Sequence, residues 1–287
     1  MIRSVVTAML SLALATTATA GADTLPANHG QLQTKLFLGQ GDQQKLVVGF
    51  GGSEGGNAWA SRVWEAEREK LLAGGYALLA VGYFGRPGLP PALDRIELSS
   101  IRRAIREAQA DPRVVDGCAA LVGGSKGAEL ALVLATRFPD DAQAVVGIVP
   151  GDAVFPALTM DLATSSWSLD GQPLPFAPMT EAAVAPAMRG DKRAAFAAIR
   201  AEAPPASLIG IERLKAPLLL MSATQDELWP SREMADHLMR RLDAAPAAPA
   251  HEHRVFEGGH TVPQQHLDVM RDFLDRHYTC KASAAAR

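Results

Sequence analysis

The chain has no marked excess of charge of either sign, and this narrows its possible partners. Its 287 residues carry 28 Lys and Arg against 31 Asp and Glu, a formal net charge of −3. A nucleic-acid-binding protein needs a basic face to meet phosphates, and no block of like charges or internal repeat supplies one. We therefore expect no nucleic-acid partner. The 48% apolar content is that of an ordinary globular protein, and a single α/β domain of this length can bury a full core.

Long apolar runs are missing too, so no segment predicts a stable membrane span. The one short run, residues 5–15, follows a positive start and precedes a stretch of small residues. This pattern is typical of a secretory signal peptide cleaved after Ala20 or Ala22, and an N-terminal core helix is the alternative. We predict a signal peptide over residues 1–22, a single mature domain over 23–287, and export to a bacterial periplasm or secretion.

Cysteines and metal ligands are scarce as well. Cys118 lies in an apolar run that looks like a buried strand, and Cys280 lies in the polar tail. An exported protein could pair them, but such distant thiols predict a bond only weakly, and we expect a buried thiol and a tail thiol. His251 and His253 could form a metal pair, but no third ligand is in view, so we expect solvent-facing histidines. The sequence calls for no metal and no cofactor, and it leaves the oligomeric state open.

What the chain does contain is a regular alternation of strands and helices. Apolar runs predict strands at 45–50, 76–83, 117–123, 144–149, 216–222 and 252–256. Helical patterns occupy 57–73, 96–110, 126–138, 231–242 and 264–277. Near-continuous apolar strands separated by helices predict an α/β fold, with a mostly parallel central sheet, helices on both faces and right-handed crossovers.

One long segment interrupts this alternation. Residues 151–215 contain seven prolines and no clear strand, with helical pieces around 181–188 and 191–203. A long irregular insertion inside a compact domain is usually functional or a lid. We predict that it forms a cap over the site.

The sequence Gly-Gly-Ser-Lys-Gly at 123–127 matches the pattern G-x-S-x-G. An apolar strand runs into it, and a helix that is apolar nearly all round runs out of it. This context is typical of a nucleophile elbow, whose turn is too sharp for side chains near the serine. A glycine-rich turn that binds an anion is the alternative, but the spacing of a P-loop or dinucleotide motif is absent. We predict Ser125 as the nucleophile.

A serine nucleophile needs a base, and the base needs an acid to orient it. His260 lies in a loop after the strand at 252–256, and Asp226 follows the strand at 216–222. The chain order Ser, acid, His is that of an α/β-hydrolase. Glu227, next to Asp226, is the competing acid. A helix-capping role for Asp226 is disfavoured because Ser231 is the better cap.

An oxyanion hole needs two backbone N–H donors. One should come from Lys126, next to the nucleophile. The other should come from Gly52 or Ser53, in the turn at 51–56 with its four glycines. Lys126 and Glu129 could pair on one helix face, and we assign their side chains no catalytic role.

Three blocks of the sequence resemble the C-terminal catalytic domain of the acyl-CoA thioesterase and bile acid-CoA:amino acid N-acyltransferase family. They are GYFGRPGLP at 82–90, GSKGAELAL at 124–132, and SSW at 165–167 with GQPLP at 171–175. The resemblance spans roughly residues 45–277. It implies an α/β-hydrolase fold, a triad of Ser125, Asp226 and His260, and cleavage of fatty acyl thioesters. A serine at the nucleophile position implies hydrolysis, whereas a cysteine would imply transfer to amino acids.

The sequence departs from this family in two ways. Family members usually carry an N-terminal β-sandwich domain, for which the mature residues before 45 are too few. An exported enzyme would also rarely meet coenzyme A thioesters, which are cytoplasmic. The likeness therefore supports acyl transfer to water better than it supports coenzyme A as the leaving group.

Together these features predict a serine acyl hydrolase that forms an acyl-enzyme. Its substrate would be a small-molecule ester or thioester with an apolar acyl chain held under the cap. Tyr83, Phe84, Trp167 and Phe176 could line that pocket, or could simply pack in the core. The alternatives are an exported carboxylesterase or peptidase-like hydrolase, a non-catalytic module that binds a lipid or other ligand, and an acyltransferase to an amine.

Overall fold

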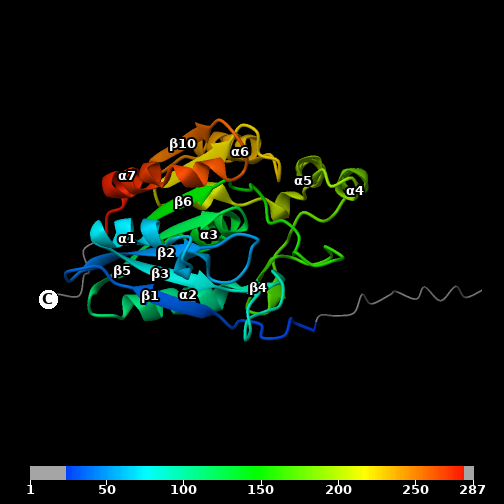
Figure 1. The fold of residues 1–287 in the computed structure, drawn as a ribbon. Coiled ribbons are helices and arrows are strands. Elements are labelled where there is room, and N and C mark those ends of the chain that lie inside the picture. The colour runs from blue at the N-terminus through cyan, green and yellow to red at the C-terminus, as the bar shows by residue number, and fades with distance from the viewer. Residues whose placement is uncertain (1–23, 281–287) are drawn as a thin grey trace, which may run out of the picture.

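A seven-stranded, mostly parallel sheet forms the centre of the computed structural model, which describes residues 24–280 (Figure 1). The strand order is β1-β3-β2-β5-β6-β9-β10. The bounds are β1 (Gln33–Phe37), β2 (Gln44–Phe50), β3 (Tyr76–Gly82), β5 (Val114–Gly124), β6 (Ala144–Ile148), β9 (Leu218–Ala223) and β10 (His251–Phe256). Only β1 runs antiparallel to its neighbour. The predicted mostly parallel sheet is confirmed.

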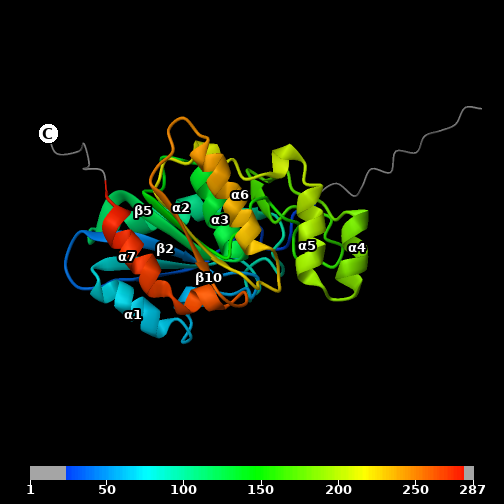
Figure 2. The ribbon, with the colours of Figure 1, turned by 90° about the horizontal axis from the view of Figure 1, so that it is seen from above.

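Helices cover both faces of this sheet (Figures 1 and 2). One face carries α1 (Glu65–Ala73) and α7 (Leu267–His277), and the other carries α2 (Leu98–Gln109), α3 (Lys126–Arg137) and α6 (Ser231–Asp243). Strands buried on both faces need apolar residues at nearly every position, and all seven residues of β3 are buried.

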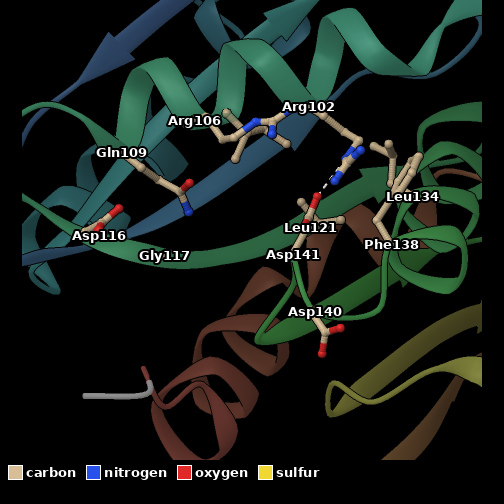
Figure 3. A pocket seen from close by; sticks show the side chains of 11 residues that line it. Arg102, Arg106, Gln109, Asp116, Gly117, Leu121, Leu134, Phe138, Asp140 and Asp141 are labelled. Carbon is tan, nitrogen blue, oxygen red and sulfur yellow. Dashed lines mark hydrogen bonds and ion pairs between the residues drawn. The ribbon is translucent and has the colours of Figure 1, made fainter. Parts of the chain in front are cut away.

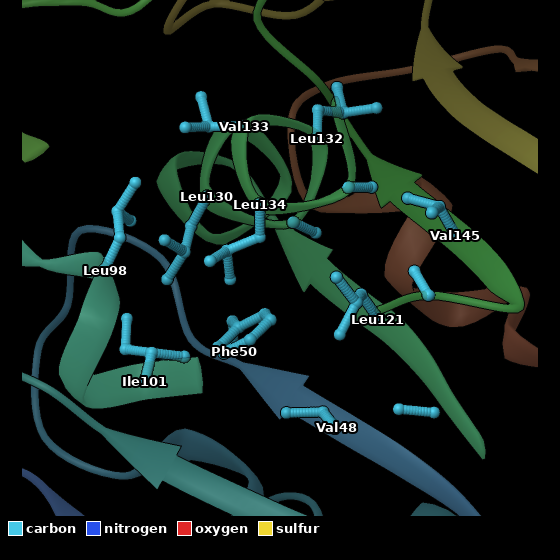
Figure 4. Close-up of a cluster of buried hydrophobic side chains, with 14 of the residues drawn as sticks. Val48, Phe50, Leu98, Ile101, Leu121, Leu130, Leu132, Val133, Leu134 and Val145 are labelled. Carbon is cyan, nitrogen blue, oxygen red and sulfur yellow. The ribbon is translucent and has the colours of Figure 1, made fainter. Parts of the chain in front are cut away.

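The larger hydrophobic core lies between the sheet and the α2–α3–α6 face. Figure 4 shows Val48, Phe50 and Leu121 of the sheet meeting Ile101 of α2 and Leu130 of α3. Residues 126–136 of α3, which directly follow Ser125, are all buried, and those from Leu130 to Ala135 belong to this core.

The segment 151–215 contains both of its predicted helices, α4 (Glu181–Met188) and α5 (Lys192–Ala201). They pack side by side and project from one end of the molecule (Figure 2). The prediction of no strand here is wrong. The segment forms β7 (Trp167–Leu169), which pairs with β4 (Ile96–Glu97), and β8 (Gln172–Pro173). Strands of two or three residues are too short to leave a periodic pattern in the sequence.

Three of the predicted helices that cover the sheet begin later than expected, and one of them is α2, which starts at Leu98 rather than at residue 96 because Ile96–Glu97 form β4. In place of a helix from residue 57, a 3-10 turn at Ala58–Ala60 precedes α1. Trp59 of this turn packs directly on Gly49, where an added Cβ would lie 2.5 Å from the indole. The last helix is likewise preceded by a 3-10 turn, Val262–Gln265. At the first of these 3-10 turns, burial of the large Trp59 side chain sets the local conformation, which sequence periodicity does not report.

Cys118 and Cys280 form a disulfide, with 5.3 Å between their Cα atoms. The expectation of two separate thiols is therefore wrong. The tail is not a free polar end, because Tyr278 is fully buried, stacks on Tyr76 and donates to the Leu46 carbonyl. This docking brings residue 280 back to β5.

Within residues 24–280, no helix is long and apolar enough to cross a membrane. The predicted signal peptide, residues 1–22, lies outside the described residues.

Candidate active site

Ser125 sits on a sharp turn between β5 and α3, with φ +55° and ψ −120°. Residues other than glycine rarely adopt a positive φ, because their Cβ atom clashes with the backbone. Residues held in this strained conformation are concentrated at functional sites. Gly123 and Gly127, on either side of Ser125, pack so closely against the backbone that no larger residue fits at either position. A Cβ on Gly123 would lie 2.0 Å from the Gly127 carbonyl oxygen, and a Cβ on Gly127 would lie 2.4 Å from that of Gly51. The turn therefore has the geometry of a nucleophile elbow.

The helix behind Ser125 contains a buried ion pair. Lys126 Nζ lies 2.7 Å from Glu129 Oε2, and both side chains are almost fully enclosed. Glu129 also accepts hydrogen bonds from the Phe155 amide and the Trp167 indole. Burial raises the pKa of Glu129 and lowers that of Lys126, and their mutual attraction opposes both shifts. The expected pairing is present, but inside the protein, where it ties α3 to segment 151–215.

His260 and Asp226 form a buried pair. His260 Nδ1 lies 2.8 Å from Asp226 Oδ1 and 2.9 Å from Oδ2. The amides of Leu228 and Trp229 also donate to Asp226 Oδ1. Burial alone would raise the pKa of Asp226, but hydrogen bonds, first that with His260, outweigh it and hold the pKa below its usual value. The carboxylate is thus kept ionised beside the imidazole.

The competing acid, Glu227, occupies a different position. Its side chain is exposed, and its Oε2 accepts the backbone N–H of His260 at 2.9 Å. Glu227 therefore steadies the loop, while Asp226 contacts the ring. The expected capping role of Ser231 is wrong. Pro230 is the N-cap of α6, and Ser231 Oγ instead accepts the Ala223 amide at 3.4 Å.

Ser125 and His260 line one cavity of about 620 Å³. Its walls come from the loop between β2 and α1, from Arg86, and from the loops carrying Leu228 and His260. Within residues 24–280 no hydrogen bond joins the Ser125 and His260 side chains. In enzymes without bound substrate, the hydrogen bond between nucleophile and base is often long or poorly aligned. No residue of segment 151–215 lines this cavity.

The four aromatic residues expected in the pocket lie elsewhere. Tyr83, Phe84 and Trp167 are buried, Phe176 packs against the same core, and none lines the cavity. The aromatic wall is formed instead by Trp59 and Trp64, whose rings are 4.7 Å apart. Sequence reasoning missed this wall because it assigned residues 57–73 to one helix and sought the pocket under the cap.

The structure brings Gly52 against the nucleophile. A Cβ on Gly52 would lie 3.2 Å from Ser125 Cβ, and Gly52 and Ser53 both line the cavity. The Gly52 N–H donates to Glu54 Oε1 at 3.0 Å. Lys126, the other expected donor, directly follows Ser125 at the first position of α3.

The two histidines of β10 are engaged with neighbouring side chains. His251 Nε2 lies 2.8 Å from Asp243, and His253 contacts Ser222 Oγ and Asp236. His253 is mostly buried rather than solvent-facing, and burial lowers its pKa. No group of side chains in the described part of the chain could hold a metal ion.

A second cavity, of about 250 Å³, lies at the opposite end of β5 between α2 and the end of α3 (Figure 3). Arg102 and Asp141 pair across it at 2.7 Å, and the Arg102 guanidinium lies over the Phe138 ring. None of its lining residues is a serine, cysteine or histidine, so this cavity holds none of the predicted catalytic residues.

Comparisons with known proteins agree with this fold. Residues 96–264 match the family described as BAAT / Acyl-CoA thioester hydrolase C terminal. Acyl-coenzyme A thioesterases 6 and 5 of Mus musculus are 28% identical over 228 residues and 27% over 239, in each case covering 78% of this chain and 50% of the relative. The chain thus spans about half the length of these relatives.

Two solved structures share the architecture. The α/β-hydrolase GrgF from Penicillium sp. sh18 superposes with a TM-score of 0.55 at 13% identity, over 86% of this chain and 99% of that one. Est1E from Butyrivibrio proteoclasticus, solved with ferulic acid, has a TM-score of 0.55 at 16% identity, over 86% and 95%. The family match covers more than half of the chain, and we conclude that this protein belongs to the family described as BAAT / Acyl-CoA thioester hydrolase C terminal and has the α/β-hydrolase fold.

Proposed function

We propose that the protein is a serine acyl hydrolase that acts through an acyl-enzyme, with Ser125 as nucleophile, His260 as base and Asp226 as the orienting acid. The observation that carries this is the buried Asp226–His260 pair facing the same cavity as a serine held at positive φ. Each feature alone has structural explanations, whereas their convergence at one cavity matches the geometry of nucleophilic catalysis.

The geometry supports the following sequence. Because Nδ1 of His260 is bound to the Asp226 carboxylate, Nε2 is left to take the Ser125 proton as Oγ attacks the acyl carbon. The ionised carboxylate stabilises the imidazolium that forms. The imidazolium then protonates the leaving thiolate or alkoxide as its bond to the acyl carbon breaks. Water then attacks the acyl-enzyme while the same imidazole takes its proton, and the imidazolium returns that proton to Ser125 Oγ as the bond between Oγ and the acyl carbon breaks and the acid leaves.

The best-supported substrate is an acyl thioester, because the curated relatives are named acyl-coenzyme A thioesterases. The apolar part of the substrate would lie on the wall made by Trp59, Trp64 and the exposed Val63. A cavity of about 620 Å³ is of the size that holds small molecules. This replaces the expectation of an acyl pocket under the cap.

A second candidate is an exported esterase, and the Cys118–Cys280 disulfide favours it. Disulfides persist in oxidising compartments and are rare in the cytosol, where coenzyme A thioesters are made. The disulfide thus supports the proposal of export. Cell fractionation with sequencing of the mature N-terminus tests this: a chain that stays in the cytosol with Met1 intact would favour the thioesterase.

The central experiment uses Ser125→Ala, with Ser61→Ala as the control because Ser61 lines the same cavity. Both variants are assayed with acyl-CoA, p-nitrophenyl ester and aminoacyl substrates, and with a fluorophosphonate probe. We expect Ser125→Ala to lose turnover and labelling while its thermal unfolding is unchanged, and Ser61→Ala to keep both. Full activity in Ser125→Ala would refute the assignment, and the substrate panel identifies the leaving group.

A further inference from the structure

The peptide group between Gly51 and Gly52 is held from both ends. The Tyr83 hydroxyl donates to the Gly51 carbonyl, and the Gly52 N–H donates to Glu54 Oε1 at 3.0 Å. Burial, together with the nearby Glu54 carboxylate, raises the pKa of Tyr83, so its hydroxyl keeps the proton that it donates. Because a peptide group is planar, fixing its carbonyl also fixes the direction of its N–H.

This peptide group adjoins the nucleophile. A methyl group built on Gly52 would lie 2.9 Å from Glu54 Oε2 and 3.2 Å from Ser125 Cβ. The carboxylate and the nucleophile therefore crowd the same glycine, and both line the catalytic cavity. The Gly52 N–H, expected from the sequence to bind a developing oxyanion, is thus already occupied by the Glu54 carboxylate.

The guanidinium of Arg86 is a second group near this turn with which the Glu54 carboxylate could pair. A Cβ on Gly56 would lie 2.7 Å from Arg86 Nε, so the guanidinium lies over the turn that directly follows Glu54. Arg86 and Glu54 are exposed and line the same cavity. No ion pair of Arg86 within 4.0 Å is present among residues 24–280, so the described structure leaves its charge available.

We propose that Glu54 is the resting occupant of the oxyanion hole, and that it moves to Arg86 in the transition state, as the developing oxyanion of the substrate takes the Gly52 N–H. This inference rests on the proposed serine hydrolase function. A carboxylate left on that N–H would repel the oxyanion and withhold a donor from it. When Glu54 pairs with Arg86 instead, the carboxylate no longer repels the oxyanion and the Gly52 N–H is free to donate to it. The new ion pair with Arg86 replaces the hydrogen bond that Glu54 made to Gly52. Glu54 is then a positioning residue whose contact with Gly52 inhibits the resting enzyme.

The test is a double-mutant cycle with a neutral substrate, so that Arg86 is not measured through a charged leaving group. The readouts are kcat and KM for a p-nitrophenyl ester and the rate of fluorophosphonate labelling of Ser125. We expect Glu54→Gln to raise kcat and labelling by about tenfold, the scale of one charge-assisted hydrogen bond. Arg86→Ala should lower kcat by about tenfold in the wild-type background and by less than about twofold in the Glu54→Gln background.

Matched controls come from the neighbouring surface. Glu69→Gln and Arg62→Ala change the same charges at exposed positions outside the cavity, and both should leave the rates unaltered. Thermal unfolding checks that every variant is folded. The change should fall on kcat rather than KM, because the N–H is needed most in the transition state.

The inference is overturned if Glu54→Gln leaves kcat unchanged or lowers it. It is also overturned if Arg86→Ala has the same effect in both backgrounds, since Arg86 would then act on the substrate directly. These outcomes differ from failure of the proposed function, which would appear as Ser125→Ala retaining activity.

Discussion

At the scale of single residues, the proposal that Asp226 rather than Glu227 is the orienting acid rests on their contacts with His260. Asp226 and Glu227 are adjacent, but only the shorter side chain reaches the imidazole, while the longer one bonds the backbone of the same histidine. The two carboxylates therefore hold His260 in different ways, one by its ring and the other by its loop.

We expect Asp226→Asn to lower kcat by about 10³-fold or more, because an amide cannot stabilise the imidazolium and favours the wrong tautomer. Glu227→Gln removes the same charge one residue away and should cost less than about tenfold. Steady-state kinetics on the best substrate measures both. A larger loss in Glu227→Gln would assign the acid to Glu227.

The elbow makes a second prediction about adjacent residues. Gly123→Ala would place a methyl group 2.0 Å from the Gly127 carbonyl oxygen, whereas at Gly124 the nearest atom to such a methyl group is Gln264 Nε2 at 3.7 Å. Forcing atoms into a packed site costs about 1–3 kcal/mol or more. Urea unfolding should therefore show Gly123→Ala strongly destabilised and Gly124→Ala within about 1 kcal/mol of the wild type. Equal stabilities would contradict the elbow geometry.

At the scale of elements, a buried carboxylate joins the projecting segment to the sheet. Asp152 follows β6, is fully buried, and its Oδ2 accepts bonds from Arg200 of α5 and His237 of α6. Removing one partner from a buried charge is costly, so this contact holds α5 in place. Segment 151–215 is thus held in place without lining the cavity that Ser125 and His260 share.

A second link, between β10 and α7, depends on pH. Glu252 accepts hydrogen bonds from Arg276 at 2.6 Å and from Arg254 at 2.8 Å, and the bond from Arg276 is the main reason that its pKa falls from 4.5 to about 2. A depressed folded-state pKa stabilises the protein above the ordinary value, and that stabilisation disappears as the pH falls from about 4.5 to about 2.

Glu252→Gln should therefore be less stable than the wild type at pH 7, by less than about 1 kcal/mol because solvent screens the pair. The difference should shrink between pH 4.5 and pH 2, and also in 1 M salt. Urea unfolding across pH measures it. A difference that is the same at pH 7 and pH 2 would show that the charge of Glu252 plays no part.

At the scale of the whole molecule, the disulfide closes most of the chain into a loop. It joins β5 to the segment after α7 across a sequence separation of 162. Cross-links stabilise mainly by limiting the unfolded chain, and losing a native one typically costs about 2–5 kcal/mol.

We expect Cys280→Ser to lose stability within that range while its activity at 25 °C is unchanged, because the cross-link lies away from the cavity. Cys280 is the cleaner position, since Cys118 is fully buried and a serine there would leave a buried hydroxyl. Dithiothreitol should lower the stability of the wild type to that of the variant and leave the variant unaffected. An unaffected wild type would mean that the cross-link adds no stability.

Local patterns in the chain were enough to predict the α/β class, most strands and the position of Ser125. Fully buried parallel strands must be apolar throughout, and the sharp turn at Ser125 must be flanked by glycine. The edge strand β1 escaped detection because its first three residues are exposed and carry no apolar run. Chain order alone also placed Asp226 and His260 in adjacent loops.

Other features depend on how distant segments meet. The contact of Asp226 rather than Glu227 with the imidazole and the Cys118–Cys280 bond both join parts of the chain whose distance is set only by packing. The occupation of the Gly52 N–H by Glu54 is of the same kind, since a loop of four glycines has many conformations until Tyr83 and Ser125 confine it. Sequence patterns report which residues are apolar or small. Directions and distances of a few ångströms, on which the chemistry depends, arise only when the sheet, its helices and its loops are packed together.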